Sequence, residues 1–376
     1  MKWRGVDCAS EMGYYNSVMI PLTRREKFEA LFPEAPAFRY KQMEEALFSP
    51  LFKSFSHISN MPLAMRGILE KEIPWLSIKR VQLLESVKKD TYKAVVEVES
   101  LPHSSPDEIK GKRVETVLMK NARNQWTVCV SSQIGCAMAC TFCATGTMGF
   151  TRNLTADEIV DQVRLWNMFL SQKPELQERI SNVVFMGMGE PLANYENVKK
   201  AIQTLLEFTD IGVTRMTVST VGLLPLLRKL LNDPEWPSVR LAVSLHSADA
   251  LTRQQMMPSS FPSFLEELER WTKEYFEKFD SRRRHLTFEY LMLSKVNDTE
   301  MHAKALVRFA QRVGKVRINL IPYNFTGSVY KDSLPGDFDR FQKQLEDAGV
   351  TVTRRRTMGD DIAAACGQLV VEKNEE

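Results

Sequence analysis

This sequence contains few cysteines, no long apolar run and little net charge. It has six cysteines in 376 residues, too few for a disulfide framework, and a chain of this length can bury a core without such crosslinks. No apolar run approaches the ~20 residues that a membrane helix needs, and the first residues lack the apolar centre of a signal peptide. We therefore expect a soluble, cytoplasmic protein without membrane contact.

The near balance of charge identifies no partner by itself. The chain has 50 basic and 47 acidic residues, a net charge of +3. Basic residues cluster at residues 282–285 and 354–356. Such clusters can follow a phosphate backbone, but an isolated triplet is more often a solvated surface. The second triplet gains weight because another cysteine, Cys366, follows shortly after it.

The first ~95 residues have a pattern of their own. Apolar residues at helical spacing predict helices at 26–32, 40–48 and 61–73. Alternating β-branched residues predict strands at 77–85, 92–99 and 114–119, with a loop at 102–107. We expect residues 1–95 to form a helical accessory domain that includes the start of a short antiparallel β extension, and residues 96–376 to form the core.

From Trp126 onward, strand and helix patterns alternate regularly. Strands are predicted at 126–132, 182–188, 215–220, 240–246, 285–291 and 315–322, with another at 351–355. Helices are predicted at 156–170, 195–207, 223–232, 264–279, 299–313 and 337–348, the first starting with a capping box of Thr155 and Glu158. Six such units predict an α/β barrel or partial barrel with its site at the carboxyl ends of the strands.

Four of the six cysteines fall close together, at the end of the first predicted barrel strand. Cys136, Cys140 and Cys143 have the spacing C-x3-C-x2-C, which can hold a four-iron cluster and leave one iron open. Adding Cys129 would give the four thiolates of a structural zinc site, but zinc sites usually pair two short knuckles across a longer gap. The triplet resembles that of the radical S-adenosylmethionine (SAM) superfamily, in which the open iron chelates SAM.

Polar residues follow the later strands where each one ends. The turn Gly187-Met188-Gly189-Glu190-Pro191 permits a close backbone approach and offers a carboxylate to an ammonium group. Each of the other strand-end residues is unspecific alone, since such serines often cap helices and such histidines are often structural: Ser219, Ser244, His246 and Asn324. Four polar strand tips around one barrel mouth favour a ligand site.

Taken together, the motifs resemble those of the RlmN family, the dual-specificity 23S rRNA (adenine-C2)/tRNA (adenine-C2) methyltransferases. The matching segments are residues 128–133 before the triplet, 152–155, 187–191 and 359–369, which contains Cys366 among small residues. The resemblance is close from about Arg113 to Leu369 and loose before it. It implies a partial (β/α)6 radical SAM barrel that binds a [4Fe-4S] cluster through the triplet and uses two SAM molecules per turnover.

The resemblance also implies a role for each site residue. One SAM methylates Cys366, and a second is cleaved to a 5′-deoxyadenosyl radical that removes hydrogen from the S-methyl group. The carbon radical adds to adenine, whose C2 has no lone pair to attack SAM. Cys129 then resolves the covalent protein–RNA adduct through a disulfide with Cys366, and Glu115 accepts the proton. The positions that match SAM contacts are Gly189, Glu190, Ser219, Ser244, Leu245, His246 and Asn324.

The expected partners are 23S rRNA, tRNA and an electron donor such as flavodoxin or ferredoxin, and the expected state is a monomer. Two other interpretations stay open. A sister family methylates carbon 8 of the same rRNA adenine and shares both isolated cysteines and the triplet. A non-enzymatic RNA-binding protein with a structural zinc knot would explain the basic triplets and the cysteines, but it leaves Cys366 and the strand-end motifs without a purpose.

Overall fold

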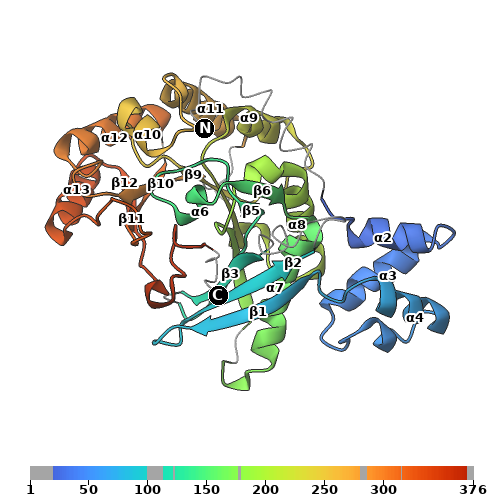
Figure 1. The fold of residues 1–376 in the computed structure, drawn as a ribbon. Helices are drawn as coiled ribbons and strands as arrows, with labels where there is room; N and C mark the ends of the chain where they lie inside the picture. Colours follow the sequence, from blue (N-terminus) through green and yellow to red (C-terminus); the bar gives the residue numbers. More distant parts are fainter. Residues whose placement is uncertain are drawn as a thin grey trace.

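The structure, a computed structural model, describes residues 20–99, 113–121, 123–176, 179–279, 286–314 and 316–370 (Figure 1). The helices are α2 (Arg24–Leu31), α3 (Ala37–Phe48), α4 (Leu63–Glu72), α6 (Ala144–Thr147), α7 (Ala156–Ser171), α8 (Tyr195–Phe208), α9 (Leu224–Asn232), α10 (Ala250–Met256), α11 (Phe264–Lys278), α12 (Glu300–Val313) and α13 (Pro335–Asp347). The strands are β1 (Ile78–Glu85), β2 (Thr91–Val98), β3 (Arg113–Lys120), β4 (Trp126–Cys129), β5 (Gln133–Gly135), β6 (Phe150–Asn153), β7 (Ile180–Phe185), β8 (Met216–Thr220), β9 (Arg240–Ser244), β10 (Leu286–Met292), β11 (Arg317–Pro322) and β12 (Thr351–Arg354).

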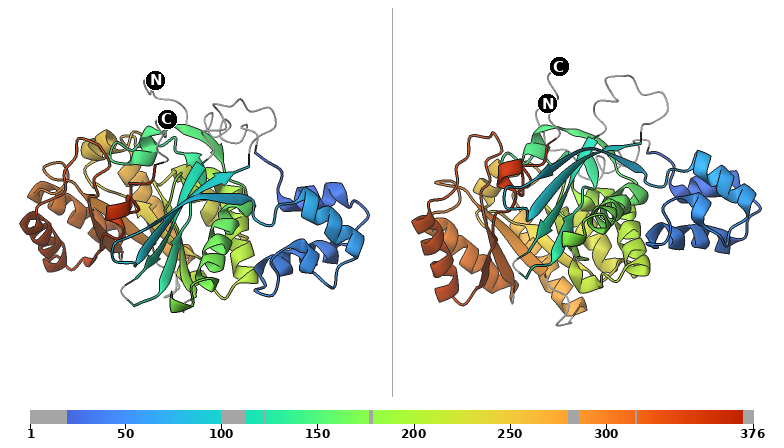
Figure 2. Two further views of the ribbon diagram at one scale, coloured as in Figure 1. Left: turned by 60° about the horizontal axis from the view of Figure 1, so that its bottom comes forward. Right: turned by 90° about the horizontal axis from the view of Figure 1, so that it is seen from below.

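Helices α2 to α4 form a small unit at one side of the molecule, as the two views of Figure 2 show. Its core is an apolar cluster of its own, in which Phe28, Met43 and Leu69 are buried. A buried polar network ties it to α7, because Asp161 accepts hydrogen bonds from Arg24 and from the backbone of Ser77. The separate clusters support a small helical domain beside a larger α/β domain, which we propose as the division of the chain; the expected boundary at residue 95 lies within β2.

One ten-stranded sheet runs through the larger part, in the order β1-β2-β3-β4-β7-β8-β9-β10-β11-β12. Strands β1 to β4 pair antiparallel, whereas every pairing from β4 to β12 is parallel. The predicted antiparallel extension is therefore continuous with the barrel sheet, because β3 pairs with β4 in the register Val117 to Cys129. The parallel strands with their crossover helices form the expected α/β partial barrel.

The apolar faces of the barrel helices pack on the outside of the sheet, where Trp166, Leu205 and Leu268 are buried in one large cluster. Helix α7 begins at the predicted capping box: Thr155 accepts from the Glu158 backbone and Glu158 accepts from the Thr155 backbone. The anchored start of α7 fixes the end of the segment that contains the cysteine triplet. Among the described residues, no helix has the length and apolarity needed to cross a bilayer.

The structure differs from the prediction around the triplet. The strand expected at 126–132 ends at Cys129, since the chain leaves the sheet to form β5, which pairs with β6 in a separate two-stranded sheet. Neither this pair nor the short helices α6 and α10 follow from a sequence pattern of useful length. The basic run 282–285 and the loop 102–107 lie outside the described residues.

Candidate active site

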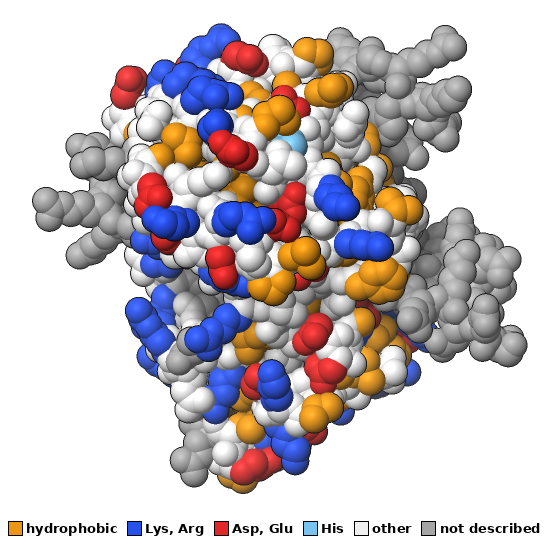
Figure 3. Space-filling view, turned by 90° about the vertical axis from the view of Figure 1, so that its left-hand side faces the viewer, with side chains coloured by type: hydrophobic (Ala, Val, Ile, Leu, Met, Phe, Trp, Pro, Cys, Tyr) orange, Lys and Arg blue, Asp and Glu red, His pale blue; other side chains and the backbone are white. Residues whose placement is uncertain are grey.

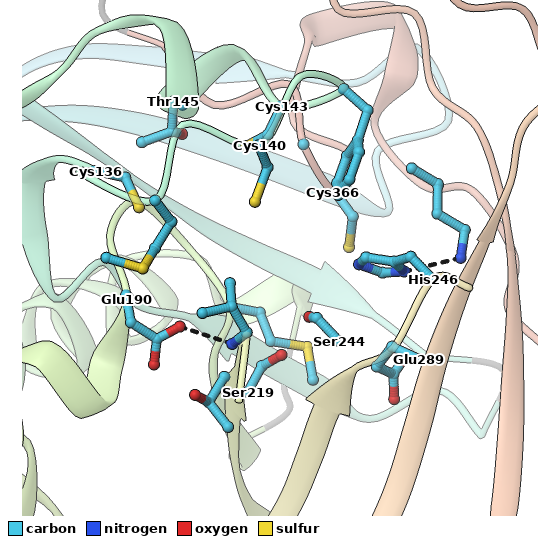
Figure 4. Close-up of a pocket in the computed structure, with 18 of the residues that line it drawn as sticks. Cys136, Cys140, Cys143, Thr145, Glu190, Ser219, Ser244, His246, Glu289 and Cys366 are labelled. Atoms are coloured by element: carbon cyan, nitrogen blue, oxygen red, sulfur yellow. Dashed lines mark hydrogen bonds between the residues drawn. The ribbon is translucent and has the colours of Figure 1, made fainter. Parts of the chain in front are cut away.

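A hollow of about 170 Å³ lies at the carboxyl ends of the parallel strands (Figure 4). Most of the predicted site residues line it: Cys136, Cys140, Cys143, Gly189, Glu190, Ser219, Ser244, His246 and Cys366. In Figure 4 the cysteines reach in from one side, and Glu190, Ser219 and Ser244 lie on the opposite side. The fold therefore brings together residues that are more than 200 positions apart in sequence, from Cys136 to Cys366.

The triplet loop is held by backbone contacts rather than by regular structure. Thr141 donates through its backbone N and its hydroxyl to the Met256 carbonyl, at 3.0 and 3.1 Å. Gly146 has no room for a Cβ, which would lie 2.7 Å from the Cys140 carbonyl oxygen. The ring of Phe142, just before the last cysteine, packs edge-on against the ring of His246, with 5.0 Å between the ring centroids. The aromatic residue of the motif thus fixes the loop against the end of β9.

The three thiols of the triplet share one environment, and Cys129 belongs to another. Burial raises the pKa of Cys136 to about 12 and the pKa values of Cys140 and Cys143 as well, and the three thiols also act on one another. Burial likewise raises the pKa of Cys129 to about 12, and the thiol that raises it further is Cys366, which also acts on Cys143; no triplet thiol acts on Cys129. This separation favours a three-thiolate ligand set over a four-cysteine zinc knot.

The triplet thiols line a shared space instead of closing round one ion. Among the described residues, no three Cys, His, Asp or Glu side chains are close enough to hold a single metal ion. A cation lies beside Cys140: Arg253 is fully buried, and burial lowers its pKa to about 9 although the Cys140 thiol opposes that shift. Its Nη1 has no hydrogen-bond partner within the described part of the chain. A buried cation beside the Cys140 thiol suits a ligand that makes this thiol anionic.

Glu190 is held by backbone donors at the turn after β7. Its carboxylate accepts from the backbone of Leu192 at 3.0 Å and of Val221 at 2.8 Å. Burial raises its pKa to about 7, and those donors oppose the rise. Gly189 adopts a φ of +99°, and a Cβ there would lie 2.5 Å from Gln133. The positive φ and this clash both favour glycine, because a Cβ would displace Gln133, whose Oε1 accepts from the Glu190 backbone.

The tips of β8 and β9 supply hydroxyl and imidazole groups. Ser219 and Ser244 line the hollow, and His246 accepts from the Leu291 backbone through Nδ1 at 3.0 Å. Burial, with Arg253 nearby, lowers the pKa of His246 to about 3, so its ring is neutral. Leu245 is buried outside the described wall of the hollow, and its carbonyl accepts from Arg253 Nε at 3.1 Å.

Cys366 is exposed and lines two hollows at once. The second, of about 470 Å³, also contains Cys129. Asn324 lines the second hollow and donates to the Cys366 carbonyl at 3.2 Å, so it contacts the cysteine segment and not the first hollow. Gly367 accepts from the Ala144 backbone at 2.8 Å. Cys366 is therefore anchored between the triplet loop and the end of β11.

Glu115 lies on β3, outside the described walls of both hollows. It is 2% exposed and forms an ion pair with Lys93 at 3.0 Å. Its Oε2 accepts from the backbone of Val370 at 3.0 Å. The expected proton acceptor is thus next to the segment that carries Cys366 but is covered by it.

Four functional candidates were absent from the sequence interpretation. Lys93 and Arg253 carry no local motif, because only the fold brings them to Glu115 and Cys140. Asn297 donates to the carbonyls of His246 and Leu291 at 2.7 and 2.6 Å and so supports the ends of β9 and β10. Glu289 accepts from Arg355 at 3.4 Å in the first hollow. In the sequence, Glu289 stands out only as a charged residue within an apolar strand, and Arg355 only as part of a basic run.

The comparisons with known proteins agree with this geometry. A family profile described as the radical SAM superfamily matches residues 130–306. A solved radical SAM methyltransferase from Sphaerobacter thermophilus has 34% identity and a TM-score of 0.80, covering 93% of this chain and 97% of that one. The site and fold are therefore those of a radical SAM enzyme.

The curated relatives narrow the class. A probable dual-specificity RNA methyltransferase RlmN from Chlorobium phaeobacteroides is 40% identical over 344 residues, 90% of this chain and 91% of the relative. An RlmN from Desulfotalea psychrophila is 39% identical over 345 residues, 90% of each chain. The chain belongs to the dual-specificity RNA methyltransferase family RlmN, and it is a SAM-dependent enzyme that uses a [4Fe-4S] cluster.

Proposed function

We propose that this protein forms 2-methyladenosine in 23S rRNA and in tRNA, with Cys366 carrying the transferred carbon. The observation that supports this most is that Cys366 lines both hollows, beside the triplet on one side and Cys129 on the other. A single thiol in this position can receive a methyl group at one hollow and meet a second thiol at the other.

The first hollow suits SAM and the cluster. Cys136, Cys140 and Cys143 provide three thiolates, and the Glu190 carboxylate faces the same space and can accept from the SAM ammonium group. Ser219, Ser244 and neutral His246 offer hydrogen-bond partners to SAM. When bound, the cluster supplies the electron that cleaves SAM, which generates the radical that activates the S-methyl group. We propose that an external one-electron donor such as flavodoxin or ferredoxin reduces the cluster.

The later steps belong to Cys129 and Glu115. After the new carbon–carbon bond forms, the adduct radical would return one electron to the cluster and lose the proton from carbon 2. Cys129 would then attack the Cys366 sulfur as a thiolate, so that the bond between this sulfur and the transferred carbon breaks, the carbon takes up a proton, and 2-methyladenosine in the RNA and a disulfide remain. Glu115 is proposed as the proton acceptor. Its carboxylate accepts from Val370, so the segment after Cys366 has to move before Glu115 can reach the substrate. Gly189, Leu245 and Asn324 would support SAM or the Cys366 segment through short contacts.

Mass spectrometry of nucleosides tests the reaction. RNA from cells lacking this gene should lack 2-methyladenosine in 23S rRNA and tRNA, and the gene should restore it, whereas a Cys366→Ala allele should not. The 8-methyl isomer in place of 2-methyladenosine would reassign the enzyme to the carbon 8 reaction. Light scattering of the purified protein tests the proposed monomer, and imaging of a tagged copy tests the proposed cytoplasmic location.

A further inference from the structure

The second hollow extends from Cys129 and Cys366 to the amino ends of β8 and β9, where Arg215 and Arg240 lie. We propose that this hollow holds the target nucleotide of the RNA, with the base beside Cys366 and the phosphates at Arg215, Arg240 and Arg356. The inference rests on the proposed role of Cys366 and adds to it the position of the RNA.

The strand register connects the two ends of the hollow. Cys129 is paired with Val184, Val184 with Thr217, and Thr217 with Arg240. All four line the hollow, so one row of residues crosses three strand spacings, about 14 Å, from the resolving cysteine to an arginine. The row places a cation at a fixed distance from the cysteine pair, on rigid strands rather than on a loop.

Three arginines that line the hollow have no balancing charge: Arg215 and Arg240 at the far end, and Arg356, which follows β12. Arg215, Arg240 and Arg356 are exposed and form no ion pair with any described residue, and no Asp or Glu is among the described residues that line the hollow. Arg354 and Arg355 differ, because they pair with Asp339 at 2.9 Å and Glu289 at 3.4 Å. Partial desolvation by its neighbours lowers the pKa of Arg240, although the side chain is exposed, and the nearby guanidinium groups of Arg317 and Arg215 lower it further. Such a group of like charges is stabilised by a bound anion.

The outer face over α12 and α13 provides a contrast. There blue and red side chains interleave (Figure 3), and exposed pairs such as Lys304 with Glu300 at 2.5 Å and Lys343 with Asp347 at 2.8 Å balance each other. Arg215, Arg240 and Arg356 lack such partners among the described residues. Arg215 and Arg240 are set apart because they line one hollow that has no carboxylate among its described residues, which suits a polyanionic substrate.

The other end of the hollow suits a base. Val184, Met186 and Ile321 provide apolar surface near Cys366, and Asn324, which donates to the Cys366 carbonyl, provides an amide group. An unstacked base of single-stranded RNA is held by packing on its faces and by hydrogen bonds to its edges, while its backbone follows cations. Apolar surface at one end and arginines at the other match these two requirements.

The test is RNA binding by the double variant Arg215→Ser/Arg240→Ser, measured with a short stem–loop RNA that carries an unpaired adenosine. Each contact with a single-stranded phosphate contributes about 0.7 to the slope of log affinity against log salt, so the slope should flatten by about 1.4. Lysine at both positions should restore most of the slope. The charge-matched control Arg308→Ser/Arg340→Ser, on the exposed faces of α12 and α13, should keep it.

A second readout separates this inference from the proposed function. Methylation of Cys366 by SAM without RNA, measured by peptide mass spectrometry, should be unchanged in the double variant. An unchanged slope, or one reduced equally by the control variant, would overturn the nucleotide site and leave the role of Cys366 intact. Loss of Cys366 methylation in the double variant would also overturn it, since the arginines would then act on the SAM hollow. Wild-type protein without methylated Cys366 would instead contradict the proposed function.

Discussion

Lys93 and Glu115 form a buried ion pair whose two members hold the two ends of the segment that carries Cys366. Lys93 Nζ lies 3.0 Å from Glu115 Oε1 and donates to the Ala363 carbonyl at 3.1 Å. Glu115 Oε2 accepts from the Val370 backbone at 3.0 Å. Because both residues are on strands of the main sheet, the sheet determines where Cys366 sits between the two hollows.

Lys93→Met should therefore loosen this segment and destabilise the protein. Removing one partner of a buried ion pair typically costs about 3–5 kcal/mol, because the other charge stays buried. We expect a lower urea midpoint and a changed rate of Cys366 alkylation in cluster-free protein, with partial rescue by Lys93→Arg. Lys79→Met, on the exposed edge of β1, is the control. If Lys93→Met matched the control in both measurements, the ion pair would not position the segment.

Iron and sulfide analysis should distinguish the cluster ligands, represented by Cys140, from Cys129. Cys140→Ala should lose the iron, the sulfide and SAM cleavage, because two thiolates do not hold the cluster that SAM needs. Cys129→Ala should keep iron and sulfide at the wild-type level, since Cys129 lines the second hollow and is absent from the described wall of the hollow that holds the triplet. Anaerobic iron and sulfide analysis measures both. Equal losses in the two variants would show that Cys129 is a ligand after all.

Glu190 should give a pH dependence with a defined sign. Its pKa of about 7 in the folded protein lies above the ordinary 4.5, so the folded state holds more protons than the unfolded state between these values. The free energy of unfolding of cluster-free protein should fall as pH rises through this window, by at most about 1.4 kcal/mol per pH unit from this group. Glu190→Gln should remove that contribution, as urea unfolding across the window can measure. A wild-type slope retained in Glu190→Gln would assign the titration to another group.

Arg253 should raise the reduction potential of the cluster through its positive charge, without contacting SAM. Its charge lies beside Cys140, and its Nε and Nη2 donate to the carbonyls of Leu245 and Val221 at 3.1 and 2.8 Å. Arg253→Met should lower the reduction potential by about 60 mV, the equivalent of a tenfold change for one electron. Potentiometric titration followed by electron paramagnetic resonance measures this. A potential that shifts equally in Arg253→Lys would point to lost carbonyl contacts and not to lost charge.

The sequence was sufficient for elements that carry local signals. The helix at 156–170 was predictable because Thr155 and Glu158 cap it and apolar residues repeat along one face, and the structure has it as Ala156–Ser171. The strand-end positions of Glu190, Ser219, Ser244 and His246 followed from the alternation of strands and helices, since parallel strands bring their carboxyl ends to one edge. These residues do line one hollow.

Contacts between distant segments could not be predicted in the same way. Lys93 and Arg253 gain their significance only through Glu115 and Cys140, which lie far away in sequence. The joining of β3 to β4 depends on pairing across a turn, and the pattern of each strand alone does not specify its neighbour. Asn324 was placed correctly at the end of β11, but its amide faces Cys366 because the C-terminal segment folds back over it.

The most direct test of the account is the state of Cys366 in Cys129→Ala. Cys129 is proposed to act only after the carbon–carbon bond has formed, so its removal should block release and leave the earlier steps intact. Purified Cys129→Ala should carry RNA attached covalently at Cys366, visible as a shifted band after denaturation and mapped by mass spectrometry, whereas Cys366→Ala should carry none. Normal turnover by Cys129→Ala, or a methylated Cys366 and an intact cluster without attached RNA, would contradict the role of this cysteine pair.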